Sequence, residues 1–236
     1  MRALASSQVV AIWERGSRQG AAARALTMLG AALPGSTREE LARYGIGRRD
    51  ACLLELRERT FPGALEAYAE CPRCAAPLEY ALEASDLRAR GARAEEGPLT
   101  MEAEGVRLEL RIPDTTDLEC AVRAASVEEA RREIARRCIS GWPGGELPEA
   151  VVAQAAARLE EADPGADLVI DLECPACGER WQAVFDIASY LWTEVQAAAK
   201  RLMGEVVVLA RAFGWRERDI LAMSPARRRF YLEAAG

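Results

Sequence analysis

The sequence predicts a mostly helical α+β protein, in which N-terminal helices and a long C-terminal helix flank a small antiparallel sheet. Apolar residues recur every three or four positions over much of the chain, as amphipathic helices require, and a few short runs alternate with a period of two, as half-buried strands do. Two Cys-x-x-Cys pairs, Cys71/Cys74 and Cys174/Cys177, stand beside such alternating runs. Their spacing is typical of zinc-binding turns, so the sheet is expected to be zinc-ribbon-like and split by a helical insertion.

The composition limits the class of protein. With 236 residues, of which 50% are hydrophobic and 29% charged, the chain is long enough for one large domain or two small ones and too apolar for wholesale disorder. Its net charge of -6 makes nucleic acid an unfavourable partner. No long apolar run follows Arg2, and the late helical stretch carries charges such as Glu194 and Lys200, so no membrane partner is expected. Seven cysteines with metal-type spacing indicate a reducing cytoplasm.

The first region, residues 1–70, is predicted to be entirely helical. Residues 6–32 are rich in alanine and large apolar residues, with interruptions near Gly16 and Gly20. Pro34 and the glycine after it end this segment, because proline cannot continue a helix.

The rest of this region is expected to contain further helices. Thr37 and Glu40 have the spacing of a capping box, in which each side chain accepts a hydrogen bond from the other residue's backbone N–H. Asp50 is expected to begin a longer helix that ends near residues 61–62. Residues 65–70 are expected to continue helically up to the first cysteine pair.

The middle region, residues 71–186, is predicted to be the split zinc ribbon, with the helical insertion over about residues 114–165. One sheet is expected to hold the metal at its tips and to combine the alternating runs at residues 78–82, 106–112, 168–172 and 180–185. The charged, glycine-containing residues 86–98 are expected to form a mobile loop.

Two helices are predicted within the insertion. Ser126 and Glu129 have capping-box spacing before a helix that runs through Cys138. Pro148 begins a second helix, which ends at residues 163–165, an Asp-Pro-Gly sequence.

The last region, residues 187–236, is predicted to contain the longest helix and a docking tail, so that the three regions form one compact unit. Asp186 is a suitable N-cap for a helix over residues 187–213, which Gly214 ends. Its apolar stripe is wider than one seam, and it either packs against the N-terminal helices or docks another protein in part. Ser224 and the proline after it begin the final helix.

The final segment, which follows a short helix at residues 217–221, combines arginines with aromatic side chains. It is either a solvated helix end or a docking element, since these residue types are enriched at interface hot spots. The candidate partner-binding residues are Trp215, Arg227, Arg228, Arg229, Phe230 and Tyr231.

The two cysteine pairs predict one structural zinc ion. Four thiolates fill a tetrahedral site, with Zn–S distances of about 2.3 Å, and leave no position for substrate or water. The chain has no histidine to compete with them. Closing the long loop between the pairs costs about 4 kcal/mol, less than the roughly 10–16 kcal/mol with which structural zinc binds. Loss of one ligand, as in Cys174→Ser, is expected to destabilise the whole fold.

Details of the two turns also carry expectations. Gly178 suits the positive φ that such turns often need, whereas Ala75 would cost about 1 kcal/mol in the same conformation. Arg73 and Arg180 adjoin the cysteines and can offset surplus negative charge. A Cys-x-x-Cys pair can also be a redox motif, or each pair can hold a separate metal. The remaining cysteines, expected in the core, are Cys52, Cys120 and Cys138.

Several stretches resemble a family of baseplate proteins from contractile-tailed phages and phage-derived contractile injection systems, whose members are often labelled baseplate hub assembly chaperones. The resemblance spans most of the chain and is densest over residues 168–232. It is carried by Asp171–Gly178 (DLECPACG), Trp181, Phe185–Trp192 (FDIASYLW), Leu209–Trp215 (LARAFGW), Ile220–Leu232 (ILAMSPARRRFYL), Ile46–Asp50 (IGRRD) and the first cysteine pair. It implies zinc on Cys71, Cys74, Cys174 and Cys177 and a non-enzymatic product that binds other baseplate or tail proteins.

The leading hypothesis is therefore a zinc-stabilised structural or assembly component of a baseplate, either transient in the cytoplasm or retained in the particle. The alternative is a zinc-ribbon regulator that binds nucleic acid through Arg227–Arg229, against the acidic balance of the chain. An enzyme is the weakest hypothesis, and no small-molecule substrate is expected, because there is no histidine for a catalytic triad and no phosphate-binding glycine loop. Asp114 and Asp117 follow a strand, where capping is their expected role.

Overall fold

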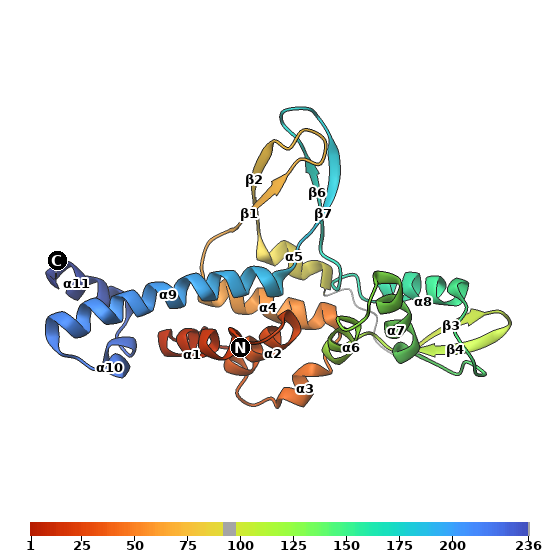
Figure 1. Ribbon diagram of the computed structural model, residues 1–236, viewed down its shortest axis with the longest axis horizontal. Coiled ribbons are helices and arrows are strands. Elements are labelled where there is room, and N and C mark those ends of the chain that lie inside the picture. Colours follow the sequence, from red (N-terminus) through yellow and green to blue (C-terminus); the bar gives the residue numbers. More distant parts are fainter. Residues whose placement is uncertain (92–97, 236) are drawn as a thin grey trace.

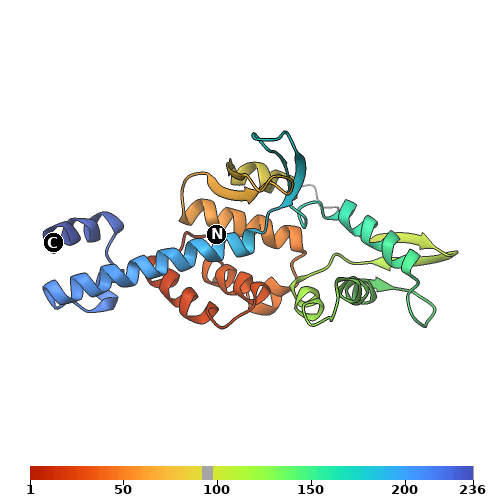
Figure 2. The same cartoon turned by 45° about the horizontal axis from the view of Figure 1, so that its top comes forward.

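The computed structural model describes residues 1–91 and 98–235, and it has the predicted mostly helical α+β architecture. Figure 1 shows an elongated molecule with a helical body in the middle, from which α9 runs to one end. An arm of two β-hairpins projects from the body. The insertion, which here comprises the helices and small sheet of residues 99–162, forms the opposite end. Figure 2 shows the same arrangement from a second direction. Within those described residues, no helix combines the length and apolarity needed to span a membrane.

The body is built from N-terminal helices and the first part of the long helix: α1 (Ser6–Gly16), α2 (Ala21–Ala32), α3 (Arg38–Ala42), α4 (Ile46–Thr60) and α9 (Ile187–Phe213). Asp186 caps α9 as predicted, by accepting hydrogen bonds from the N–H groups of Ala188 and Ser189. The apolar stripe of α9 is buried in one core with residues of α1, α2 and α4, so the core-packing interpretation is confirmed for most of its length.

The predicted start of α4 at Asp50 is wrong, because the helix begins at Ile46. Gly45 is its N-cap, with φ -52° and ψ 150°, and the buried carboxylate of Asp50 accepts a 2.7 Å hydrogen bond from Arg49 instead of capping the helix. The capping box of Thr37 and Glu40 is present at the start of α3.

Two antiparallel hairpins form the arm: β1 (Leu65–Glu70) with β2 (Pro77–Leu82), and β6 (Val169–Glu173) with β7 (Arg180–Val184). The expectation of helix over residues 65–70 is wrong. Their side chains alternate between more and less buried positions, and each residue pairs with one in β2. Leu65 and Tyr68 are spaced as on a helix, but the pairing partner that decides the outcome lies further along the chain.

The strand at residues 106–112 does not belong to the arm, and in the described residues the predicted single sheet is replaced by three sheets. The insertion contains its own sheet of β3 (Leu99–Ala103), β4 (Val106–Leu110) and β5 (Ile139–Ser140). This sheet packs with α8 (Glu149–Ala162) around a small separate core that includes Leu99, Cys138 and Leu159. The two remaining helices of the insertion are α6 (Thr115–Ala121) and α7 (Val127–Cys138).

The expected loop at residues 86–98 is helical in its first part, where α5 (Ala84–Gly91) packs beside α4; residues 92–97 lie outside the described part. The C-terminal segment follows the prediction. Gly214 ends α9 with a φ of 69°, and α10 (Glu217–Leu221) and α11 (Pro225–Ala235) follow.

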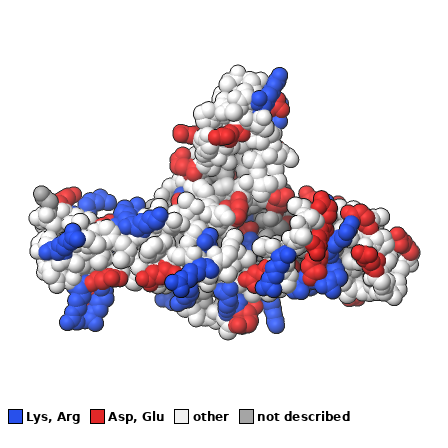
Figure 3. All heavy atoms as spheres, viewed as in Figure 1, with Lys and Arg blue, Asp and Glu red and all other residues white. Residues whose placement is uncertain are grey.

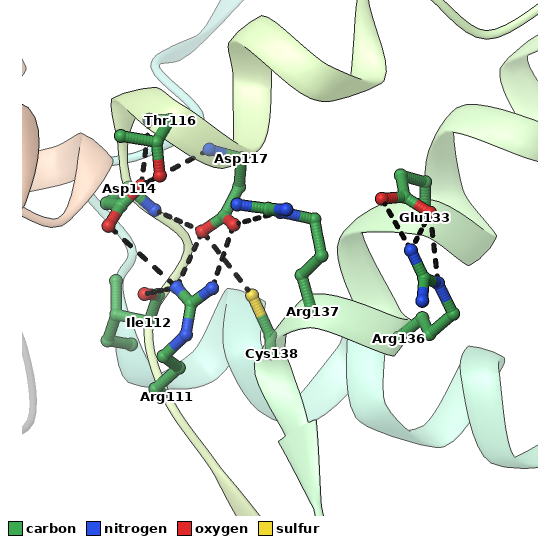
Figure 4. A network of polar contacts seen from close by, with 9 residues as sticks. All are labelled: Arg111, Ile112, Asp114, Thr116, Asp117, Glu133, Arg136, Arg137 and Cys138. Carbon is green, nitrogen blue, oxygen red and sulfur yellow. Dashed lines mark hydrogen bonds and ion pairs between the residues drawn. The ribbon is translucent and has the colours of Figure 1, made fainter.

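Asp117 of α6 binds arginines from α7 and from the segment that follows β4 (Figure 4). Its fully buried carboxylate accepts hydrogen bonds from Arg111 at 2.6 and 2.8 Å, from Arg137 at 2.7 Å and from the N–H of Asp114 at 2.9 Å. Asp114 in turn caps α6 by accepting from the N–H groups of Thr116 and Asp117. The predicted capping role of this acidic pair is thus confirmed. Burial would raise the pKa of Asp117, but these hydrogen bonds outweigh it and hold the pKa well below its usual range.

We predict that Asp117→Asn lowers the free energy of unfolding by about 3 kcal/mol at pH 7, because two arginines lose a buried anionic partner. A carboxylate with a depressed pKa stabilises the fold above its unfolded pKa of about 4, and this stabilisation is lost as the pH falls towards the folded value. Denaturant titrations should therefore show that the free energy of unfolding falls less between pH 7 and pH 3 in the variant than in the wild type.

The control for Asp117→Asn is Glu133→Gln, which breaks the exposed ion pair with Arg136 on the same helix (Figure 4). Its expected effect is below about 1 kcal/mol. Equal effects of the two substitutions would contradict a structural role for the Asp117 network.

Candidate metal centre

The four cysteines of the two predicted turns meet at the outer end of the arm. Cys71 and Cys74 lie in the turn between β1 and β2, and Cys174 and Cys177 in the turn between β6 and β7. Their sulfur atoms all lie within 4.8 Å of one another. Figure 1 shows the two hairpins side by side with these turns at the tip. The structure thus brings together all four residues that the sequence assigned to the metal, and the cluster can hold a metal ion.

The two turns have the same backbone hydrogen bonds. In the first, the carbonyl of Cys71 accepts from Ala75 N–H at 2.9 Å, and Cys71 N–H donates to Ala76 at 3.0 Å. In the second, the carbonyl of Cys174 accepts from Gly178 N–H at 2.9 Å, and Cys174 N–H donates to Glu179 at 2.8 Å. Each hairpin therefore presents its sulfurs from an equivalent loop.

The residue after the second cysteine has a positive φ in both turns, as expected. The φ angle is 72° at Gly178 and 56° at Ala75. Glycine adopts this conformation freely, whereas alanine is strained in it by about 1 kcal/mol. The first turn keeps the conformation despite that cost, because its hydrogen bonds and the sulfur geometry require it.

The distances between sulfurs fit a tetrahedral ion. Cys71 Sγ lies 3.7 Å from Cys177 Sγ, and Cys74 Sγ lies 3.6 Å from Cys174 Sγ. A metal–sulfur distance of about 2.3 Å in a regular tetrahedron separates the sulfurs by about 3.8 Å. A disulfide bond, at about 2.0 Å, is far shorter. Both close pairs join one hairpin to the other, so an ion here would tie the hairpins together.

The thiols of the cluster influence one another's ionisation. Burial raises the pKa of Cys174, but hydrogen bonds from the N–H groups of Cys177 and Ala176 and from neighbouring thiols outweigh it and bring the pKa to about 7. The N–H of Glu179 lowers the pKa of Cys177, but burial and the adjacent sulfurs raise it to about 12 overall. One thiolate thus forms readily and opposes the next, whereas a bound cation favours all four.

Charges around the cluster are largely paired. Arg73 lies 3.5 Å from a carboxylate oxygen of Glu179, and Arg180 lies 2.8 Å from one of Glu173. The two arginines adjoin the turns as predicted, but their charge is shared with these glutamates. The two arginines therefore neutralise only part of the negative charge that four thiolates would carry.

The base of the arm is held by a residue that the sequence analysis missed. Arg57 of α4 is 4% exposed and donates to the carbonyl oxygens of Gly63 and Ala64, which lead into β1. It also donates to Glu194 of α9, at 2.9 and 3.1 Å. Arg57 follows Leu53 and Leu54 at helical spacing on a buried face, and this placement of a charged residue was the available signal.

The other predicted residues lie outside the cluster. Cys138 is buried, which confirms the core expectation for it, while Cys52 and Cys120 are half-buried. The candidate partner-binding residues lie at the far end of α9 (Figure 1). Arg228 among them is 4% exposed, and its guanidinium donates a 2.8 Å hydrogen bond to Glu205, so it holds α11 against α9. The others stay candidates.

Comparisons with known proteins identify no relative. No protein-family model, curated protein or solved structure matches the chain.

We predict that Cys174→Ser abolishes stoichiometric metal binding and loosens the arm. Amide hydrogen exchange should increase in β1, β2, β6 and β7, while α4 and α9 keep their protection, because Arg57 and the body core hold the bases of the hairpins. The sequence predicts that Cys174→Ser destabilises the whole fold. Because the cluster lies at the outer end of the arm, we now expect the destabilisation to be limited to the arm.

Cys120→Ser is the matched control for Cys174→Ser, since Cys120 lies outside the cluster and is half-buried. It should retain the metal and the exchange pattern of the wild type. Unchanged metal content and arm protection in Cys174→Ser would refute the assignment of this ligand.

Gly178→Ala should lower the stability of the metal-loaded protein by about 1 kcal/mol, measured by denaturant titration. A Cβ at Gly178 would meet no atom within 4 Å, so the loss reports backbone strain alone. Ala75→Gly, at the equivalent position of the other turn, should be neutral or slightly stabilising, because relief of strain is offset by the greater freedom of glycine in the unfolded chain. If Gly178→Ala and Ala75→Gly lowered the stability by similar amounts, the two turns would not be equivalent.

Proposed function

We propose that this chain is a non-enzymatic, zinc-stabilised structural or assembly component of a contractile tail or injection-system baseplate. It acts by docking to other baseplate or tail proteins. The observation that carries the proposal is the cluster of Cys71, Cys74, Cys174 and Cys177, which joins two hairpins about a hundred residues apart in sequence.

Zinc is the proposed occupant because of the donor set and its spacing. Thiolates favour zinc or iron–sulfur centres over hard cations such as Mg²⁺. The sulfur separations of 3.6 and 3.7 Å suit a single ion of the size of zinc. Cys71 and Cys174 are buried, Cys177 is half-buried and Cys74 is exposed, so the cluster is partly covered by protein. The chemistry that zinc supplies here is cross-linking of the two turns.

A non-catalytic role follows from the completeness of the ligand set. Four protein thiolates saturate a tetrahedral ion, so no position remains at which a substrate or water would be activated. The Asp114–Asp117 pair is engaged in capping α6 and in binding arginines. We therefore assign no catalytic role to the four cysteines or to this pair of carboxylates.

The baseplate assignment draws on the family resemblance. Its densest part, residues 168–232, comprises β6, the second cysteine turn, β7, α9, α10 and most of α11. The resembling residues thus include two of the metal ligands and the end of the molecule that carries exposed aromatic side chains. A scaffold that combines a rigid metal-linked arm with a separate docking end suits a protein that positions others.

The proposal predicts that affinity-tagged full-length chain, purified from the cell that produces it, carries baseplate or tail proteins as its main partners by mass spectrometry. Fractionation of assembled particles from free protein then tells a retained component from a transient one. Cys174→Ser should reduce this association, and Cys120→Ser should leave it intact.

A salt-sensitive gel shift with DNA or RNA, together with no associated tail proteins, would contradict the baseplate role. That result would favour the regulator that binds nucleic acid. The expectation against it is the net charge of -6, which disfavours a polyanion.

A further inference from the structure

Four aromatic side chains gather at the end of the molecule farthest from the insertion. We call Phe213, Trp215, Phe230 and Tyr231 the aromatic end cluster. Phe213 is the last residue of α9, Trp215 lies in the loop before α10, and the other two belong to α11. Trp215, Phe230 and Tyr231 are among the candidate partner-binding residues predicted from the sequence, whereas Phe213 is not.

The rings contact one another in fixed geometries. Phe213 and Trp215 stack with centroids 4.6 Å apart, and Tyr231 forms T-shaped pairs with both, at 5.9 and 4.8 Å. Phe230 packs edge-on against Tyr231 at 5.5 Å. Such pairs add about 0.5–1.5 kcal/mol beyond their buried area, so the cluster is held in one arrangement.

Buried polar contacts fix the helix that carries half of the cluster. The guanidinium of Arg228 donates to Glu205 of α9 at 2.8 Å and to the carbonyl of Met223 at 2.6 Å. Because α11 is anchored in this way, the aromatic surface exists before any partner arrives. A preformed surface loses little conformational entropy on binding.

Much of this surface remains exposed. Phe230 is 65% exposed and Phe213 39% exposed, and Val207 and Val208 on the last turns of α9 are 45% and 44% exposed. Exposed apolar side chains gathered in one place mark interaction sites, and aromatic residues dominate interface hot spots. Intramolecular packing thus leaves part of the end of α9 uncovered.

The same end of the molecule is basic. Residues 200–235 contain eight Lys and Arg residues and four Asp and Glu residues, a net charge of +4 in a chain whose total is -6. In Figure 3, Lys and Arg predominate over this end of the molecule. Arg211, Arg216 and Arg229 are exposed and make no ion pair with any described residue, and Arg227 lies over the Tyr231 ring at 5.7 Å.

We propose that the aromatic end cluster docks an acidic protein segment that carries an apolar anchor residue. The anchor would pack on Phe230 and Phe213, and the acidic side chains would pair with the free arginines around them. This proposal rests on the proposed function and names the chemistry of the partner that this end of the scaffold takes.

A protein segment suits the surface better than single-stranded nucleic acid does. Bases bind by stacking on free ring faces, but Phe213 and Trp215 already stack on each other and Tyr231 abuts both. The rest of the chain has a net charge of -10, the difference between -6 and +4, and would repel a polyanion that extends beyond the cluster. A short acidic segment ends within the basic region.

The test is selection from a random peptide library displayed on a surface, using the full-length, metal-loaded chain as bait. The selected peptides, made with a fluorescein label, are then titrated by fluorescence anisotropy. We expect sequences rich in Asp and Glu around an aromatic or aliphatic residue, whose binding weakens as salt is added. Phe230→Ala and Arg227→Glu should each weaken it about tenfold.

Two controls separate the cluster from the rest of the surface. Arg18→Glu makes the same charge change at an exposed arginine on α1's C-terminal side, and Val127→Ala removes an exposed apolar side chain from α7. Both should bind the peptides as the wild type does. Unchanged melting temperature and metal content verify that the test variants fold.

The proposal is overturned if the selected peptides are neutral or basic, if no peptide is selected, or if Phe230→Ala and Arg227→Glu bind unchanged. It is also overturned, in favour of nucleic acid, if labelled oligothymidylate binds and the same two variants lose that binding. Failure here with tail proteins still co-purifying would leave the proposed function standing. Loss of both would refute the function itself.

Discussion

Convergence of four sulfur atoms from two distant turns is the constraint on which the arm depends. The cysteine pairs are separated by about a hundred residues. The chain between them leaves the arm after β2 and returns at β6, and it must place the two cysteine turns next to each other. Closing such a loop costs about 4 kcal/mol, well below the binding energy of a structural metal. The short distances run between hairpins, from Cys71 to Cys177 and from Cys74 to Cys174, so an ion there joins the hairpins to each other.

The arm is held at both ends by different chemistry. At its tip, each two-stranded sheet is too small to be stable alone, and an ion held by the four cysteines would link the two sheets. At its base, Arg57 binds the chain entering β1, and the hydroxyl of Tyr190 on α9 donates to the carbonyl of Glu66. Between these ends, inward-facing residues such as Leu172 continue the core of the body into the hairpins. The arm is thereby coupled to α9, whose far end carries the aromatic surface.

Local signals in the sequence were sufficient for the four clustered cysteines and most helices. The spacing of the cysteines identified their turns, and Asp186 and Gly214 marked the two ends of α9 by ordinary capping chemistry. Long-range pairing was not accessible in the same way. Residues 65–70 become a strand only because β2 pairs with them, and β4 joins a separate sheet because β3 and β5 lie beside it. Burial of Arg228 likewise depends on Glu205 of another helix.

X-ray absorption at the zinc edge, combined with elemental analysis of the purified chain, tests the central claim most directly. A single shared site predicts one zinc per chain, surrounded by four sulfurs at about 2.3 Å and no nitrogen or oxygen ligand. Two ions per chain, no tightly bound metal, or a first shell containing oxygen would contradict it. The meeting of the two cysteine turns at the outer end of the arm would then need another explanation.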